Sequence, residues 1–550
     1  MGDYDQLSPC FICVMKKQNF LLLLLFPCIM LHSQDYQMNW QQCFGGSMLD
    51  GAYDIIAIEN GYFIAGGTGS NDGDITFSYG NGDGWLIKTD SNGNLIWEKN
   101  YGGSDSEGFS RIIPTSDNNF YLLGTSFSSD GDISYDPYPD SPDYWIIKID
   151  SSGNIIWDRI VGGNMGEVLF TGDASMDGGV VAVGWTYSND GDVSINYGGA
   201  DTWAVKINSD GELEWEFTIG TDWIDKGQAI IQTSDGGYLI ASSSSFHENA
   251  IGNITCIPHT YGWAEGILFK LDSNLKVEWQ KCYGGSDNDG ITALIEVSNG
   301  YVFGAYVNSN DGDISGWHGA NDIWIVKLDF NGNIVWQKPL GGSRSEFIST
   351  LLLTDDESII IPGYTQSNDG NVSGNHTMSE YDYDIWFVKL NSEGDLLSQQ
   401  CFGGAGSEIL EFGFVKKSDN NFVIAGQTDY GPSFDVGCTP HGGNWDEDFW
   451  VFEIKDTLTS IQTNPSVGGE VKVYPNPAWD YVCFDVAGSG QVEMPEVKIF
   501  TNQGIPVQNP VLYNTKGRII WDVRSVAPGV YFYQLTNNIN YSWQGKVVVN

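Results

Sequence analysis

Short runs of alternating apolar and polar residues fill most of the chain, and one of them recurs. "WLIKTDSNGNLIWEKNYGG" begins at Trp85, "WIIKIDSSGNIIWDRIVGG" at Trp145 and "WIVKLDFNGNIVWQKPLGG" at Trp324. Each copy places β-branched and aromatic residues on both sides of an Asp-x-x-Gly turn, which is the pattern of a β-hairpin. We see no helical period of useful length, so the sequence predicts an all-β fold.

The hairpin belongs to a unit that occurs seven times. Six copies carry a lysine at one position, and the seventh carries Glu453. The marker lysines are Lys88, Lys148, Lys206, Lys270, Lys327 and Lys389. Successive markers lie 57 to 64 residues apart, which accommodates four short strands and one long loop. Seven such units predict a seven-bladed β-propeller, with a β-solenoid as the alternative.

The seventh copy stops halfway, and its missing half lies near the start of the chain. "WVFEIKD" begins at Trp450, whereas "NWQQCFGG" begins at Asn39. We expect the strand around Trp40 to complete the blade formed by about residues 411–456. This closure would remove an exposed strand edge and join the ends of the ring. The predicted propeller spans residues 34–458.

The N-terminal segment has the features of an export signal. Two lysines precede the apolar run Phe20–Leu31, which is too short to cross a bilayer. We expect residues 1–33 to hold an N-terminal extension and a signal peptide, with either Met1 or Met15 as the true start. A lipoprotein modified at Cys28 is the alternative. No later stretch has the length and apolarity of a transmembrane segment, so we expect none in the mature protein.

The pattern changes after the polar linker 459–470. Residues 471–550 contain "VKVYPNPAWDYVCFDV", "WDVRSVAPGVYFYQLTNN" and "GKVVVN". This region resembles the type A C-terminal sorting domain of the type IX secretion system, on Tyr474, Pro475, Asn476, Pro477, Gly529, Tyr531, Gly545 and Lys546. The resemblance implies a small β-sandwich, handling by the type IX secretion machinery, cleavage of the tail, and anchoring at the cell surface or release. An ordinary accessory β-sandwich is the alternative.

The repeats carry a second resemblance, over about Trp40 to Asp456. Their strand, Asp-x-x-Gly turn and Trp strand resemble the blade signature of quinoprotein-type propellers. They are still more similar to large secreted repeat proteins of Bacteroidetes bacteria, in "SNDGDISG" and "DIWIVKLDFNGNIVWQKPLGG". The first resemblance concerns blade architecture, and no cofactor ligands are carried over from it.

Charge narrows the set of partners. The chain has 71 Asp and Glu against 25 Lys and Arg, a formal net charge of −46. Such a field repels nucleic acid and anionic membranes and attracts cations, so we expect no nucleic-acid partner. Because 41% of the residues are hydrophobic, the chain can build a large core.

Six cysteines follow the predicted signal: Cys43, Cys256, Cys282, Cys401, Cys438 and Cys483. Cys43, Cys282 and Cys401 occupy one repeat position, and equivalent positions on different blades should lie too far apart to form a disulfide. We therefore predict that these three are small apolar fillers. A disulfide between Cys256 and Cys438 is left open. None of these six cysteines forms a C-x-x-C pair that would suggest a structural zinc site.

An acidic loop motif recurs five times. "SNDGDI" and its near-copies begin at Ser70, Ser128, Ser188, Ser309 and Ser367. Its carboxylates could hold a structural Ca²⁺, or the same residues could form Asx-turns in a long loop. The candidate calcium ligands are Asp72, Asp74, Asp130, Asp132, Asp190, Asp192, Asp311, Asp313 and Asp369.

A second set of acids, which we call the ring acids, lies five residues after the aligned glycine in all seven units. The ring acids are Asp50, Glu107, Glu167, Asp225, Asp289, Glu346 and Glu408. Each precedes the predicted innermost strand, on the face that also carries the Gly-Gly and Asp-Gly-Asp loops. We expect them around the mouth of the central channel, where they cap their own loops or share a cation or ligand.

A tyrosine or histidine follows each acidic loop or its counterpart in the degenerate units. The residues are Tyr79, Tyr138, Tyr197, His259, His318, His376 and His441. Tyrosine is a poor substitute for a neutral imidazole, so the alternation favours a packing and hydrogen-bonding position over a zinc ligand.

Enzyme motifs are scarce, with no H-E-x-x-H, G-x-S-x-G or phosphate-cradling Gly-Lys loop. Units four and seven depart most from the repeat, and Trp263 and Trp445 in their loops are candidate ligand-stacking residues. We therefore expect a non-enzymatic binding or adhesion module for extracellular glycan or protein. The alternatives are a carbohydrate-active enzyme acting on extracellular polysaccharide and a structural surface component.

Overall fold

The computed structural model describes residues 36–456, apart from 140, 246–249, 260–263 and 443–445, and the strands of the C-terminal region with a few flanking residues. The predicted signal segment, 1–33, lies outside the described residues. So do the sorting residues Pro475, Asn476 and Pro477 and the two candidate stacking residues, Trp263 and Trp445.

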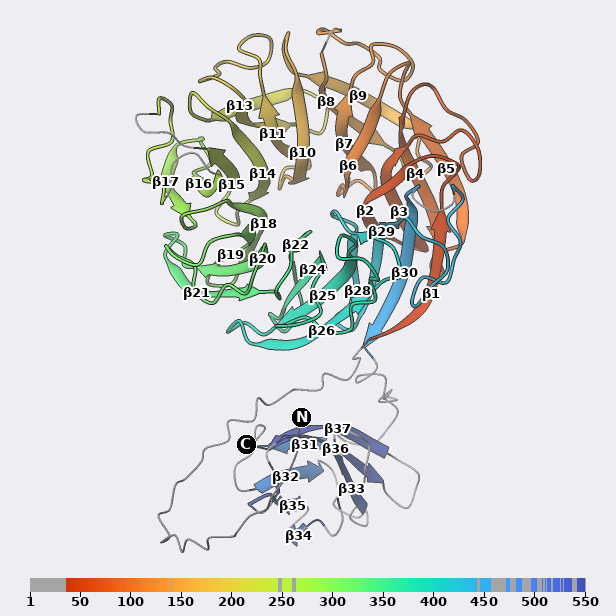
Figure 1. The fold of residues 1–550 in the computed structure, drawn as a ribbon, viewed down its shortest axis with the longest axis vertical. Helices are drawn as coiled ribbons and strands as arrows, with labels where there is room; N and C mark the ends of the chain where they lie inside the picture. Colours follow the sequence, from red (N-terminus) through yellow and green to blue (C-terminus); the bar gives the residue numbers. More distant parts are fainter. Residues whose placement is uncertain are drawn as a thin grey trace, which may run out of the picture. The chain divides into compact units, whose positions relative to one another are not determined.

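The described strands before residue 457 form seven antiparallel sheets arranged as a ring (Figure 1). These are the blades of a β-propeller, as the repeat predicts. Within each blade the first strand lies innermost, because strands β2, β6, β10, β14, β18 and β22 surround the centre of the ring. No helix occurs among the described residues.

The first four blades are regular. Blade 1 is β2 (Asp50–Ile58), β3 (Gly61–Thr68), β4 (Asp83–Asp90) and β5 (Leu95–Tyr101). Blade 2 is β6 (Glu107–Pro114), β7 (Phe120–Ser126), β8 (Asp143–Ile149) and β9 (Ile155–Val161). Blade 3 is β10 (Glu167–Ala174), β11 (Val180–Thr186), β12 (Asp201–Ile207) and β13 (Leu213–Ile219). Blade 4 is β14 (Asp225–Gln232), β15 (Tyr238–Ser245), β16 (Ala264–Leu271) and β17 (Val277–Tyr283).

The innermost strand is divided in two in blades 6 and 7. Blade 5 is β18 (Asp289–Val297), β19 (Gly300–Val307), β20 (Asp322–Leu328) and β21 (Ile334–Leu340). Blade 6 is β22 (Glu346–Ile348), β23 (Leu352–Leu353), β24 (Ile359–Thr365), β25 (Asp384–Leu390) and β26 (Leu396–Phe402). Blade 7 is β27 (Glu408–Ile409), β28 (Phe414–Ser418), β29 (Asn421–Thr428), β30 (Asp448–Asp456) and, from the other end of the ring, β1 (Tyr36–Phe44).

The ring closes through β1, which pairs antiparallel with β30. Cys43 lies opposite Trp450, and Trp40 lies opposite Glu453. The strand near the start of the chain therefore completes the seventh blade, as the split repeat predicts. This pairing covers an edge of β30 that would otherwise be open.

The repeated tryptophan of the third strand anchors each blade to its neighbour. Six of these side chains are fully buried: Trp85, Trp145, Trp203, Trp324, Trp386 and Trp450. Each indole N–H donates to a side chain of the blade's outermost strand, such as Glu98 for Trp85 at 3.0 Å and Gln337 for Trp324 at 2.7 Å. A buried indole needs such a partner, which explains the polar residue that follows the second tryptophan of the repeat.

The C-terminal region contains two further sheets. One orders β31 (Val471–Tyr474), β32 (Tyr481–Val486), β35 (Arg518–Asp522) and β34 (Leu512–Thr515); the other orders β33 (Glu496–Thr501), β36 (Gly529–Thr536) and β37 (Ser542–Val549). Residues of both sheets, including Phe484, Trp521 and Leu535, share one hydrophobic cluster. The predicted sandwich arrangement stays a prediction.

Trp145→Ala tests the packing between blades. The side chain is fully buried, so we expect the substitution to cost about 3–5 kcal/mol and to lower the Tm clearly. Ile156→Ala, at a position 50% exposed on the outermost strand of the same blade, is the matched control and should change the Tm little. Thermal unfolding followed by circular dichroism compares the two, and equal Tm values would contradict this account of the core.

Candidate functional site

The ring acids lie at the junctions between blades, and each begins an innermost strand. None is more than 7% exposed. Each carboxylate accepts a backbone N–H from the preceding loop at 2.6–2.8 Å, as Glu408 does from Gly404 and Glu346 from Gly342. These hydrogen bonds are the ones expected if each ring acid caps its own loop. A role for these acids in binding a cation or ligand stays a prediction.

A second carboxylate, not singled out in the sequence, accompanies each ring acid. These partner acids lie at the start of the third strand of the preceding blade: Asp83, Asp143, Asp201, Glu265, Asp322, Asp384 and Asp448. All are at most 1% exposed. The signal that could have found them is the D-x-W sequence of six units, in which the acid stands two residues before the buried tryptophan.

The first glycine of each Gly-Gly loop makes room for the two carboxylates. A Cβ on Gly102 would lie 2.6 Å from Glu107 Oε2 and 2.8 Å from Asp83 Oδ1, closer than real Cβ atoms approach oxygen. The partner-acid oxygen that faces this glycine has no hydrogen-bond partner among the described residues at Asp83, Asp322 and Asp384. The junction therefore requires glycine for space rather than for a left-handed backbone.

Burial keeps protons on several junction carboxyls near neutral pH. It raises the pKa of Glu408 to about 8, and the pKa values of Asp225, Glu346 and Asp201 to about 7. A carboxyl whose pKa rises on folding binds more protons in the folded than in the unfolded state. Its stabilising contribution is therefore complete below the unfolded pKa and is lost as pH rises through the folded value.

The Asp-Gly-Asp loops bind the same Gly-Gly loops. In blade 1, Asp72 Oδ1 accepts the N–H of Ser47 at 2.8 Å, and the N–H of Asp74 donates to the carbonyl of Gly45 at 2.9 Å. The same two bonds recur in blades 2, 3, 5 and 6. Gly73 has φ +69°, and a side chain there would collide with the carbonyl of Gly45. The motif therefore ties each long loop to the loop that enters its blade.

These bonds join two loops of one blade, and the described residues form no group of three or more His, Cys, Asp or Glu side chains that could hold a metal ion. Calcium binding by the nine aspartates stays a prediction. The hydrogen bonds to backbone N–H groups give the carboxylates partners without it.

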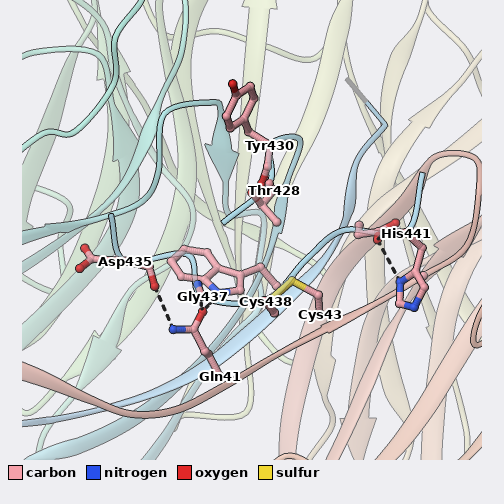
Figure 2. Close-up of a disulfide and its surroundings, with 12 residues drawn as sticks. Gln41, Cys43, Thr428, Tyr430, Asp435, Gly437, Cys438 and His441 are labelled. Carbon is pink, nitrogen blue, oxygen red and sulfur yellow. Dashed lines mark hydrogen bonds and ion pairs between the residues drawn. A yellow bond between two sulfur atoms is a disulfide. The ribbon is translucent and has the colours of Figure 1, made fainter. Parts of the chain in front are cut away.

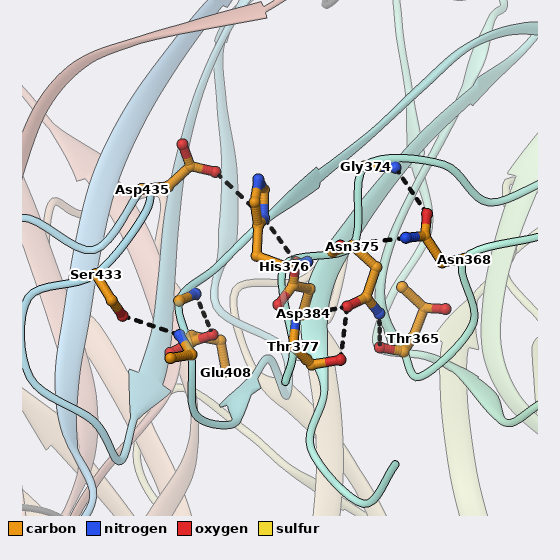
Figure 3. A network of polar contacts seen from close by, with 12 residues as sticks. Thr365, Asn368, Gly374, Asn375, His376, Thr377, Asp384, Glu408, Ser433 and Asp435 are labelled. Carbon is orange, nitrogen blue, oxygen red and sulfur yellow. Dashed lines mark hydrogen bonds and ion pairs between the residues drawn. The ribbon is translucent and has the colours of Figure 1, made fainter. Parts of the chain in front are cut away.

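The alternating tyrosine and histidine position links neighbouring blades. Figure 3 shows the junction between blades 6 and 7, where His376 Nδ1 lies 2.9 Å from Asp384 and 3.8 Å from Asp435 of the next blade's loop. Its hydrogen bond with Asp384 raises the pKa of His376. In blade 1, Tyr79 donates its N–H to Asp83 and its hydroxyl to Asp132 of blade 2. A packing and hydrogen-bonding role is therefore confirmed for this position by its contacts.

The prediction for two of the cysteines was wrong. Cys43 forms a disulfide with Cys438, and Cys282 forms one with Cys256, each with Cα atoms 5.7 Å apart. Equivalent cysteines of different blades do not pair with one another. Instead, each pairs with a cysteine in the long loop of its own blade. Cys401, at the same repeat position, is a free buried cysteine, as predicted.

The disulfides occur in blades 4 and 7, where the acidic motif is missing. In Figure 2 the Cys43–Cys438 bond fastens the β29–β30 loop to β1, and Gln41 adds hydrogen bonds to Asp435 and Gly437 of the same loop. A covalent bond thus holds the loop in the two blades that lack the full Asp-Gly-Asp clamp. The ligand-stacking role expected of Trp263 and Trp445 stays a prediction, because both tryptophans lie outside the described residues.

The central channel is lined by the innermost strands. In five blades the pairing register of this strand shifts by one residue, which forms a β-bulge with one unpaired residue. The bulge residues are Tyr53, Ser110, Phe170, Gln228 and Thr292. Bulges are frequent next to binding sites. A cavity of about 390 Å³ lies among these strands, with Arg111, Asp173, Thr292 and Phe412 in its wall.

Arg111 places a positive charge in the wall of this cavity. Its Nε lies 3.1 Å from Asp54 Oδ2, and its guanidinium lies 5.2 Å from the ring centre of Phe412. Burial raises the pKa of Asp54 to about 6, against the lowering effect of Arg111. Phe170 meets Phe412 edge to face, with ring centres 5.6 Å apart. Sequence reasoning missed this cluster because it combines two adjacent positions of four blades whose residues differ there.

An arc of exposed apolar side chains, which we call the rim, lies on the loops that enter the innermost strands of blades 1, 3 and 4 and on the loops that follow the second strands of blades 2 and 3. Its members are Met48, Leu49, Phe127, Met165, Tyr187, Trp223 and Ile224, each 42–58% exposed. Backbone hydrogen bonds place the two kinds of rim loop side by side, such as Gly69 N–H to the carbonyl of Leu49 at 2.8 Å and Tyr187 N–H to that of Gly166 at 3.0 Å. The corresponding positions of blades 5 to 7 are polar, with Asn288, Asn308 and Gln366 among them.

Residues 472–550 match the family described as a secretion system C-terminal sorting domain. The chain is an exported β-propeller, either secreted or attached at the cell surface. The match confirms the resemblance of the tail to a type IX sorting domain, and Tyr474, Gly529, Tyr531, Gly545 and Lys546 lie in its strands β31, β36 and β37. Among the described residues no helix has the length and apolarity to span a membrane.

The solved structures to which the chain is similar share little sequence with it. A polysaccharide lyase, Uly1, is 10% identical with a TM-score of 0.41, covering 75% of this chain and 90% of the lyase. The plexin A4 extracellular region is 7% identical with a TM-score of 0.43, covering 92% and 67%, and the phage phi92 endosialidase is 11% identical with a TM-score of 0.37, covering 88% and 75%. No curated protein matches the chain. These likenesses do not assign an activity.

Glu408→Gln tests the titration of the junction. Folding raises the pKa of Glu408 to about 8, so stability should fall as pH rises from about 5 to about 9. The amide has no charge to bury, so we expect a Tm higher than that of the wild type by roughly 1–3 °C at pH 9 and the same Tm near pH 5. Glu212→Gln, in an exposed turn, is the control. A variant less stable than the wild type at both pH values would contradict the account.

Peptide mapping without reduction tests the disulfides. We expect Cys43 linked to Cys438 and Cys256 linked to Cys282, with Cys401 and Cys483 unlinked. Replacing Cys256 and Cys282 together by serine should destabilise the fold by about 2–4 kcal/mol, because the bridge restricts the unfolded chain. A peptide joining Cys256 to Cys438 would overturn this assignment.

Proposed function

We propose that this protein is a non-enzymatic binding or adhesion module, which holds extracellular glycan or protein at its loop-bearing face. The observation that carries the proposal is the rim. Exposed apolar side chains gathered on one face of a soluble domain generally mark an interaction site. Here they gather over four consecutive blades, above a channel whose wall is rich in aromatic residues.

The asymmetry of the ring supports this interpretation. Positions that only build the blades are nearly the same in all units, as the buried tryptophans and ring acids are. The rim positions differ, because each of blades 1 to 4 carries at least one exposed apolar residue there and blades 5 to 7 carry none. Copying one unit around the ring would have produced equal rim positions, so their divergence points to a partner that contacts one side of the mouth.

A carbohydrate-active enzyme is the second candidate, because the channel also holds carboxylates. Burial, together with the charge of Glu447, raises the pKa of Glu411. A carboxyl group with a raised pKa is suited to general acid catalysis. This role would require a second carboxylate on the opposite side of a bound sugar.

Phe127→Ala combined with Trp223→Ala tests the binding face. The full-length protein and this variant are compared on a glycan array and on arrayed extracellular proteins, with Val335→Ala as the control at a 59% exposed position of an outermost strand. We expect the double variant to lose binding at least about tenfold, as truncation of aromatic contact residues usually does, and the control to keep it. Equal binding by all three proteins would contradict the proposed face.

Hydrolysis assays on extracellular polysaccharides test whether the protein is instead a carbohydrate-active enzyme. The module should release no product. Product formation that disappears in Glu411→Gln would establish the enzyme and overturn the non-enzymatic proposal. Absence of any ligand on either array would instead favour a structural surface component.

A further inference from the structure

We propose that the channel beneath the rim receives a basic side chain, a lysine or an arginine, of a polypeptide partner. This inference rests on the proposed binding function and names the chemistry of its ligand. The upper part of the channel forms a cavity of about 180 Å³, which is lined by Phe170, Tyr306, Phe347, Tyr364, Glu411 and Phe412. An enclosure of aromatic rings with a carboxylate is suited to an ammonium or guanidinium group.

The aromatic wall is a connected cluster. Tyr364 lies 5.3 Å from Phe347 and 5.2 Å from Tyr383 between ring centres, the second pair being edge to face. The four side chains Tyr306, Phe347, Tyr364 and Tyr383 are only partly buried, so their rings keep free surface. Ring faces carry negative charge density, which attracts a cation within about 6 Å of the ring centre.

At this level of the channel, a lysine of the chain already lies over one aromatic ring. Lys226 Nζ lies 4.6 Å from the ring centre of Trp185. Trp185 pairs with the second residue of its innermost strand, and Tyr306 and Tyr364 have the same place in blades 5 and 6. Among the described residues, no Lys or Arg lies over the rings of Tyr306 or Tyr364. Equivalent ring positions are therefore filled on one side of the channel and open on the other.

Glu411, in the wall of this cavity, and Glu447, whose charge acts on it, have no basic partner in the described part of the chain. Burial and the charge of Glu447 raise the pKa of Glu411, and the charges of both glutamates help to raise the pKa of Tyr53. Neither forms an ion pair with a described Lys, Arg or His. Like charges held together in a partly buried site are relieved by a cation between or beside them.

The remaining charges leave the site negative. Arg111 is already paired with Asp54 at 3.1 Å and lies against Phe412, and Asp173 also faces it. Lys226 is stacked on Trp185. Asp54, Asp173, Glu411 and Glu447 thus outnumber the two bases, Arg111 and Lys226. The net charge of −46 would further draw a basic partner toward the mouth.

The rim favours a polypeptide over an amino sugar as the source of the cation. Four of its seven members are Met or aliphatic residues: Met48, Leu49, Met165 and Ile224. Methionine together with aromatic residues is typical of protein interfaces, and its flexible side chain adapts to apolar partners. A lysine or arginine stem could pass this apolar rim while its charged end reaches the aromatic wall.

A random dodecapeptide phage library, selected against the full-length protein, tests the inference. We expect lysine or arginine to be enriched at one position of the selected peptides. Replacing that residue by norleucine, which keeps the stem and removes the charge, should weaken binding at least about tenfold in fluorescence anisotropy. Selection without enrichment of basic residues, or equal binding by the norleucine peptide, would overturn the inference.

Substitutions in the channel and in the rim test where the selected peptide binds. Glu411→Gln and Tyr364→Leu should each weaken the basic peptide about tenfold or more without affecting the norleucine peptide, whereas Tyr364→Phe should keep binding because it retains the ring. Val335→Ala is the control, and unchanged circular dichroism shows that the variants fold. If Phe127→Ala with Trp223→Ala abolishes binding while the channel variants do not, the proposed function stands and this inference fails.

Binding assays with oligosaccharides test whether the cation belongs to an amino sugar instead of a polypeptide. Chitosan oligosaccharides carry free amines, and chitin oligosaccharides are their acetylated counterparts. Binding of chitosan alone, lost in Glu411→Gln and accompanied by no selected basic peptide, would overturn the polypeptide in favour of an amino sugar. Failure of every peptide and oligosaccharide to bind would overturn the inference altogether.

Discussion

The propeller depends on a repeated contact between buried carboxylates and a glycine-rich loop. At each junction a ring acid accepts a hydrogen bond from a backbone N–H of the preceding loop. A partner acid of the preceding blade lies beside the ring acid, and a glycine, which has no side chain, leaves space for both carboxylates. Two buried carboxyl groups would destabilise the fold if both were charged. Hydrogen bonds to the loop and retained protons offset that cost, and in four blades a histidine also bonds the partner acid, as His376 bonds Asp384.

The long loops are built around the same contact. In five blades the Asp-Gly-Asp motif binds the Gly-Gly loop, and a tyrosine or histidine carries the connection to the next blade. In blades 4 and 7 a disulfide fixes the loop instead. The loop-bearing face is thereby rigid, which suits a surface that must present its rim and channel in one geometry.

Periodicity in the sequence was enough to predict the blades, their number and the closure by the strand around Trp40, because each of these follows from counting copies. The pairing of Cys43 with Cys438 was not predictable in this way. It depends on how a loop folds back within one blade, across 395 residues of sequence. The partner acids were visible as D-x-W but had no meaning until the junction showed what they face. The channel cluster around Arg111 and Glu411 arises from positions where the units differ, and a repeat average conceals such positions.

We propose the loop-bearing face and the channel below it as the binding surface of this exported propeller. Hydrogen exchange of the full-length protein, with and without a bound ligand, tests it most directly. The account predicts slower exchange at the rim loops around Leu49, Phe127 and Trp223 and in strands β22 and β24 beside the channel. Protection confined to the Asp-x-x-Gly turns on the opposite face, around Gly93 and Gly332, would contradict it.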